Sequence, residues 1–157
     1  MKRRNVMDFK PNNKQITGNV GLYFACYELS KMGWNVMPTS RNAKGVDLVI
    51  YSEDTKRVLK IQVKSSTKRE AINFGNKAEI FSDFFVIVTE VYAKPRTFIL
   101  RGSDIEPRLT QHKENRWLEI KDYKKDEFLE KWKNIGCGWN DTTKCTTIQK
   151  YIVDTEV

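Results

Sequence analysis

The chain has 157 residues, of which 39% are hydrophobic, and its 28 lysines and arginines outnumber its 20 acidic residues to give a net charge of +8. This length and apolar content fit one globular domain, residues 1–157, rather than a disordered chain. No apolar run approaches the roughly 20 residues of a transmembrane helix, and no apolar signal core follows the basic start. We therefore expect a cytoplasmic protein without a membrane partner.

The basic excess favours a polyanionic partner, because lysines and arginines that neutralise phosphates release counterions and so strengthen binding to nucleic acid. A solvated basic surface explains the same composition about equally well. The three cysteines, Cys26, Cys137 and Cys145, and the single histidine, His112, lack the paired spacing of a zinc site. Reduced thiols are the simplest expectation for them.

The first half of the chain predicts an arm, a helix and three strands. Residues 1–15 are polar and basic and are expected to form a flexible arm. Apolar residues then recur at helical spacing until Gly33, which predicts a helix over residues 18–32. Strands are predicted at residues 34–37, 46–52 and 57–64, with a polar loop at residues 39–44 and a turn at residues 53–55.

The second half predicts a buried strand and a less regular extension. Residues 84–89 form a near-continuous apolar run, typical of a central strand covered on both faces, and residues 96–100 are expected beside it. We assign residues 17–100 to the core and residues 101–157 to a C-terminal extension. The extension is predicted to hold a short helix from residue 103, a strand at residues 117–120, and an amphipathic helix carrying Phe128, Leu129, Trp132 and Ile135 that ends at Gly136.

Three polar residues on two predicted strands carry the functional hypothesis. Asp47 follows Gly45 and opens an apolar run, and Gln62 and Lys64 lie two apart in the next run, so they share one face of that strand. If the runs pair as an antiparallel hairpin, these three residues converge at one edge of the sheet. A carboxylate, an amide oxygen and an ammonium suit a divalent cation and an attacking water, the chemistry of phosphodiester hydrolysis.

The order of a helix, Gly45-Val46-Asp47, a hairpin and Gln62-Val63-Lys64 resembles the PD-(D/E)XK nuclease superfamily, over roughly residues 17–100. It is similar to the branch with Holliday-junction resolvases and intron-associated endonucleases. The resemblance implies an α/β fold with a restriction-endonuclease-like mixed central sheet flanked by helices. It also implies an endonuclease that uses Mg²⁺ (or Mn²⁺) to hydrolyse duplex or branched DNA, and a homodimer is possible.

The resemblance also implies roles for individual residues. Asp47 would ligate the metal, Gln62 would add its side-chain oxygen where other members carry an acid, and Lys64 would orient water or stabilise charge. Many members carry a glutamate on the first helix, where this chain has Leu22. Glu28 is the only acid in that helix, and it would reach the metal only if the helix were rotated.

Other readings of these residues stay open. Asp47 alone could be a turn residue and Lys64 a solvated strand end. With Leu22 in place of an acid, the chain could bind nucleic acid without cutting it, and a scaffold role would make the charge incidental. The hydroxyls and cations that flank the motif are candidates to hold the DNA backbone, and they are Arg41, Lys44, Ser65, Ser66, Lys68 and Arg69. Trp117, Trp132 and Trp139 could stack on exposed bases.

Overall fold

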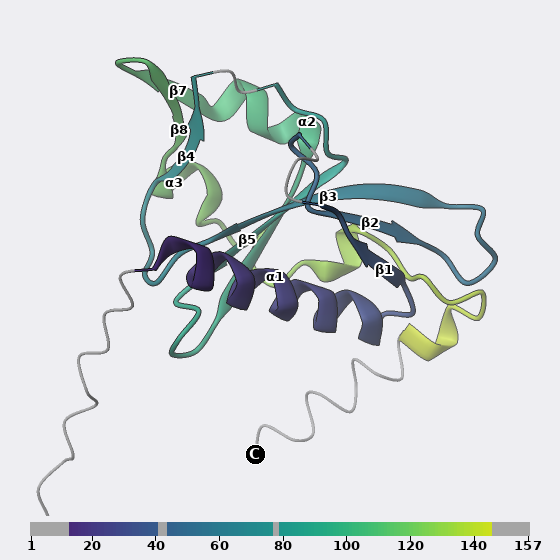
Figure 1. Ribbon diagram of the computed structural model, residues 1–157. Helices are drawn as coiled ribbons and strands as arrows, with labels where there is room; N and C mark the ends of the chain where they lie inside the picture. Colours follow the sequence, from purple (N-terminus) through teal and green to yellow (C-terminus); the bar gives the residue numbers. More distant parts are fainter. Residues whose placement is uncertain (1–12, 41–43, 77–78, 146–157) are drawn as a thin grey trace, which may run out of the picture.

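A five-stranded mixed sheet forms the centre of the molecule (Figure 1). The computed structural model describes residues 13–40, 44–76 and 79–145, so most of the predicted arm lies outside the described residues. The sheet has the order β1-β2-β3-β5-β6, in which β3 and β5 run parallel and the other pairs are antiparallel. Its strands are Asn35–Pro38 (β1), Leu48–Tyr51 (β2), Val58–Ser65 (β3), Phe84–Thr89 (β5) and Arg96–Arg101 (β6).

One long helix, α1 (Lys14–Lys31), covers one face of the sheet (Figure 1). It starts earlier than the predicted residue 18 because the Asn13 side chain accepts hydrogen bonds from the backbone N–H groups of Gln15 and Ile16. It ends before Gly33, which has a φ of +83°, as the sequence predicted. None of the helices formed by the described residues is long and apolar enough to cross a membrane.

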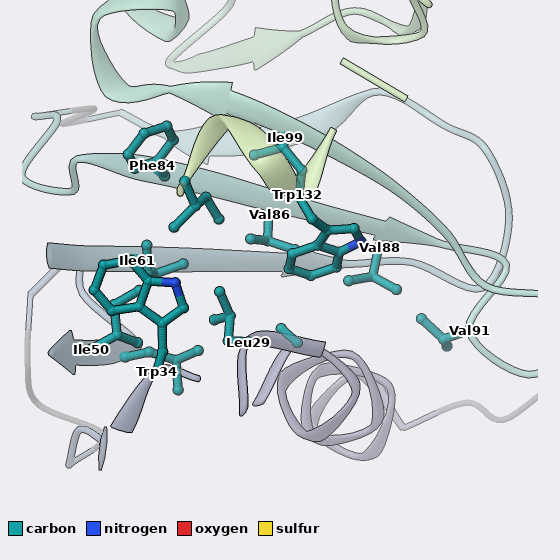
Figure 2. Packing of buried hydrophobic residues seen from close by; sticks show 13 residues of the cluster. Leu29, Trp34, Ile50, Ile61, Phe84, Val86, Val88, Val91, Ile99 and Trp132 are labelled. Atoms are coloured by element: carbon teal, nitrogen blue, oxygen red, sulfur yellow. The ribbon is translucent and has the colours of Figure 1, made fainter. Parts of the chain in front are cut away.

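The first hydrophobic core lies between α1 and the sheet (Figure 2). Leu29 of α1 packs with Ile50, Ile61 and Val86 from three neighbouring strands, and all four side chains are fully buried. Fully burying such a side chain stabilises the fold by roughly 1.5–3 kcal/mol. Because Ile61 of β3 faces this core, the residues on either side of Ile61 face the opposite side of the sheet.

The second core covers the opposite face of the sheet. Phe85 and Ile87 of β5 point into it, whereas Phe84, Val86 and Val88 point into the first core. The prediction of a central strand covered on both faces is therefore confirmed. The elements packed there include a small sheet of order β4-β8-β7 and short helices, with the bounds Ile72–Gly75 (β4), Gly102–Ile105 (α2), Glu106–Arg108 (η1), Leu109–His112 (β7), Asn115–Leu118 (β8) and Ile120–Tyr123 (α3).

The prediction of an amphipathic helix around Trp132 is wrong. Only one short 3-10 turn, η2 (Trp132–Asn134), forms there. The segment instead crosses the edge of β6, where the N–H of Ile99 donates to the carbonyl of Phe128 at 2.9 Å. Phe128 belongs to the second core, whereas Trp132 and Ile135 belong to the first. A helix would have placed these apolar side chains on one face and could not have reached both cores.

The expectation of three reduced thiols is wrong for two of the cysteines, because Cys137 and Cys145 form a disulfide. The loop that it closes contains Trp139, whose ring lies against Gly33 at the end of α1. Cys26 is a free, half-buried thiol beside the first core, and burial raises its pKa.

Two glycines of α1 give opposite predictions for stability. A Cβ on Gly21 would lie 2.7 Å from the Ser65 Cβ, whereas a Cβ on Gly18 would meet no atom within 4 Å. Gly21→Ala should therefore lower the free energy of unfolding by about 1–3 kcal/mol through overpacking. Gly18→Ala should raise it by up to about 1 kcal/mol through helix propensity.

Urea denaturation of both variants measures these changes, and a double-mutant cycle with Ser65→Gly isolates the contact. Equal effects of the two alanines, or no coupling between positions 21 and 65, would contradict the close packing of α1 on β3.

Candidate active site

The carboxylate of Asp47 is built into the β2–β3 hairpin. Leu48 pairs with Ile61, and the backbone N–H of Asp47 donates to the carbonyl of Ile61 at 2.9 Å. The side chain of Asp47 accepts a hydrogen bond from the N–H of Val63, with 2.7 Å between Oδ2 and N. One carboxylate oxygen thus continues the hydrogen-bonding ladder beyond the first residue of β2. Among the described residues, no donor bonds the other oxygen.

Strand alternation places Gln62 and Lys64 together on the face of β3 that looks away from α1. Ile61 and Val63 pack with the first core, so the residues between and beyond them point to the opposite face. The β5 partners of Gln62 and Lys64 are Phe85 and Ile87, which belong to the second core. Both polar side chains are half-buried.

The Lys64 side chain is partly shielded from water. Its ammonium lies 5.1 Å from the centre of the Phe74 ring, which β4 places over it. Burial lowers the pKa of Lys64, and the negative charge of Asp47 opposes that effect in part. The two groups attract each other without a direct ion pair between them. The cation is therefore held close to the carboxylate in surroundings that weaken its hydration.

In α1, no acidic side chain lies near this end of the sheet, where similar nucleases are expected to carry a glutamate. Leu22 packs against the first core, directly after Gly21, which meets Ser65 at the end of β3. Glu28 lies seven residues beyond Gly21, about 10 Å further along the helix, and pairs with Lys31 at 3.0 Å. This geometry does not favour Glu28 as a metal ligand, and that role stays a prediction.

The side-chain oxygens of Asp47 and Gln62 remain as candidate ligands for a metal ion. Among the residues that the structure describes, no three His, Cys, Asp or Glu gather closely enough to hold a metal ion. A carboxylate and an amide are still the hard oxygen ligands that Mg²⁺ or Mn²⁺ prefers, and Mg²⁺ commonly keeps several waters and takes substrate phosphates as ligands. The residues present therefore fit such an ion when water and a phosphate complete its shell.

The two predicted phosphate-binding serines pack against the protein, and both also border a hollow beside Lys64. Ser65 packs against Gly21 of α1. Ser66 is buried, and its hydroxyl donates to the carbonyl of Lys68. The Lys68 side chain itself is exposed. Contact of these three residues with DNA stays a prediction, and the placement supports Lys68 better than either serine.

The predicted cations around the motif differ in their placement. Arg41 lies outside the described residues. Lys44 is exposed and pairs with Glu79 at 3.4 Å. Arg69 pairs with Glu90 at 3.1 Å. Exposed ion pairs of this kind contribute little to stability, so phosphates could replace the acidic partners at low cost.

A hollow of ≈ 550 Å³ beside Lys64 was missed by the sequence analysis. Its lining comes from the start of α1, the end of β3 and the small sheet, and includes Lys14, Thr17, Asn73 and Trp117. Of these four residues, the sequence singled out only Trp117, as a tryptophan that could stack on an exposed base. Lys64, Ser65 and Ser66, which were predicted site residues, also line the hollow. Asn73 lies beside Trp117 because β4 pairs with β8, which no local pattern revealed, and Lys14 reaches the hollow from the start of α1.

Comparison with known proteins supports the fold. No protein-family model and no curated protein matches the chain. Among solved structures it is similar to a bacterial homing endonuclease, I-Ssp6803I, with 18% identity over 88% of this chain and 98% of that one, and a TM-score of 0.55. It is also similar to the Holliday junction resolvase Hjc of the archaeal hyperthermophile Archaeoglobus fulgidus, with 14% identity, coverages of 65% and 90%, and a TM-score of 0.46.

At these identities a structural likeness shows the fold alone. The chain has a restriction-endonuclease-like α/β fold, and the predicted resemblance to PD-(D/E)XK nucleases is confirmed at that level. The first of the two solved structures is an endonuclease.

The lowered pKa of Lys64 predicts that this lysine reduces stability. The cost of burying the charge is fully present at any pH below the lowered pKa of the folded protein. That cost disappears as the pH rises from the lowered folded pKa to the unfolded value of about 10.4. Lys64→Met should therefore raise the melting temperature at pH 7, and the gain should shrink near pH 10.

Thermal unfolding at the two pH values tests this, with Lys68→Met as the control because Lys68 is exposed. A Lys64→Met protein less stable than the parent at pH 7 would show that the ammonium is net stabilising.

Proposed function

We propose that the protein is a metal-dependent DNA endonuclease that hydrolyses phosphodiester bonds. The observation that carries the proposal is the Asp47 carboxylate, held at 2.7 Å by the Val63 N–H beside Gln62 and Lys64. This arrangement lies on a restriction-endonuclease-like fold whose solved neighbours are nucleases. The net charge of +8 adds to the argument, since a basic protein attracts the DNA backbone.

Each residue of the candidate site has a task in this reaction. A bound Mg²⁺ or Mn²⁺ would supply a Lewis acid for the phosphate and lower the pKa of a coordinated water. Asp47 and Gln62 would hold that ion through their side-chain oxygens. The Lys64 ammonium would stabilise the negative charge that develops on the phosphate, and Phe74 strengthens this effect because it keeps water away from the cation.

Cleavage should depend on Asp47 and Lys64. Asp47→Asn removes the anionic ligand and Lys64→Ala removes the stabilising charge, so each should lower the rate of plasmid nicking by about a hundredfold or more. DNA binding should change much less, because both variants keep the other cations of the basic surface. Nicking of supercoiled plasmid with Mg²⁺, Mn²⁺ or EDTA measures the effect.

Asp126→Asn and Lys56→Ala are matched controls, since both positions are exposed and Lys56 lies in the β2–β3 turn, at the other end of the hairpin from Asp47. Full activity of Asp47→Asn would place the metal site elsewhere in the protein.

A second function, DNA binding without cleavage, is favoured by one observation. Leu22 is packed against the first core where similar nucleases carry an acid, and among the described residues no three His, Cys, Asp or Glu gather to hold a metal ion. Fewer carboxylates mean weaker binding of a divalent cation. The fold and its basic surface would remain suited to DNA in such a protein.

The salt dependence of DNA binding tests whether the protein contacts the phosphates of the DNA backbone. The logarithm of the affinity for duplex DNA should fall linearly with the logarithm of the salt concentration, by about 0.9 per phosphate contact. Lys68→Gln should reduce that slope by about one contact, whereas Lys56→Gln should leave it unchanged. Binding with no nicking in millimolar Mn²⁺ would favour the second function, and no binding at low salt would remove both.

A further inference from the structure

We propose that the hollow beside Lys64 holds an unpaired nucleobase, stacked on Trp117, so that the protein acts where DNA has an unpaired base next to the phosphate to be cut. The inference names a substrate class and rests on the proposed function for the position of the cut. The binding of the base itself does not require that the protein cleaves DNA.

The small sheet presents Trp117 to this hollow. Leu118 and Ile72 pair across β8 and β4 and belong to the second core. Their neighbours Trp117 and Asn73 pair in the same register and point to the opposite face. Both line the hollow, and Ile72 lines it as well. The volume of ≈ 550 Å³ lies within the range of roughly 300–1,000 Å³ for ligand pockets.

Trp117 differs from the other tryptophans of the chain. Trp34 and Trp132 are 3% and 8% exposed and form part of the first core. Trp139 packs against Gly33. Like Trp139, Trp117 is half-buried and belongs to neither core, but Trp117 lines the hollow and Trp139 does not. A large aromatic face that borders an open hollow is available for stacking, and every base can stack on it.

The polar groups around Trp117 match the other parts of a nucleotide. Lys14 and Lys64 supply positive charge for the phosphates on either side of the base. The side-chain oxygen of Asn73 accepts a hydrogen bond from the N–H of Gly75 at 2.7 Å, which leaves its amide N–H groups for the edge of a base. Glu70 also lines the hollow and suits the amino group of a base rather than a phosphate.

Lys64 joins this hollow to the candidate active site. The same side chain lies on the face of β3 that carries Gln62 and also borders the hollow. A base held there would belong to a nucleotide next to the phosphate at Lys64. A base inside an intact duplex must first leave its stack, and that cost is lowest when the base is already unpaired.

The test compares two DNA duplexes in EDTA, so that no cleavage occurs. One duplex is fully paired, and the other has the same sequence with one unpaired 2-aminopurine. The parent protein should bind the second duplex more tightly and should quench the 2-aminopurine fluorescence by stacking. Trp117→Ala should lower the affinity for the unpaired duplex about tenfold and remove the quenching, with little change for the paired duplex.

Trp117→Leu should behave like Trp117→Ala, and it keeps an apolar side chain on β8 if the alanine variant does not fold. Trp117→Phe should retain most of the quenching. Tyr23→Ala is the matched control, because Tyr23 is an aromatic residue of α1 that is 64% exposed and lies outside the hollow.

Quenching that persists without Trp117, or an equal loss of affinity for both duplexes, would overturn the inference. A protein that shows the expected quenching but never nicks DNA would overturn the proposed cleavage and leave the base site standing. A protein that nicks DNA without any preference for the unpaired duplex would overturn the base site and leave the proposed cleavage standing.

Discussion

The hydrogen bond between the Val63 N–H and the Asp47 carboxylate, at 2.7 Å, is the constraint on which the candidate site depends. It fixes the start of β2 against the middle of β3, so the carboxylate stays next to Gln62 and Lys64. A slip of one residue would turn every side chain of β3 to the other face. Ile61 would then leave the first core and Lys64 would enter it. The apolar packing under β3 and the polar site above it are thus two consequences of one register.

The burial of Lys64 lowers the stability of the fold. An ammonium against the Phe74 ring loses part of its hydration, and the lowered pKa of Lys64 records that loss. The same surroundings make its charge act more strongly on anything bound beside it. Leu22 is the opposite case, since an apolar residue at this position adds to the first core. Lys64 thus lowers stability for the sake of a charge that the proposed reaction would use, and Leu22 adds to stability.

Local patterns predicted the central part of the fold well. The alternation of apolar and polar residues located β3, and the continuous apolar run located β5, because burial on one or both faces leaves a direct mark on the sequence. The same alternation predicted that Gln62 and Lys64 share a face. The start of α1 was misplaced because the signal of Asn13 as a cap was not recognised.

What the sequence did not reveal depends on contacts between distant segments. The disulfide of Cys137 and Cys145 requires a turn around Trp139, and the residues before it are apolar at helical spacing only because they alternate between two cores. The small sheet pairs β4 with β8, which lie some forty residues apart. That sheet places Phe74 over Lys64 and Trp117 beside it. The chain after β6 therefore shapes the surroundings of a site whose polar residues all lie before it, and the small sheet is the part of this fold that would set which DNA the site accepts.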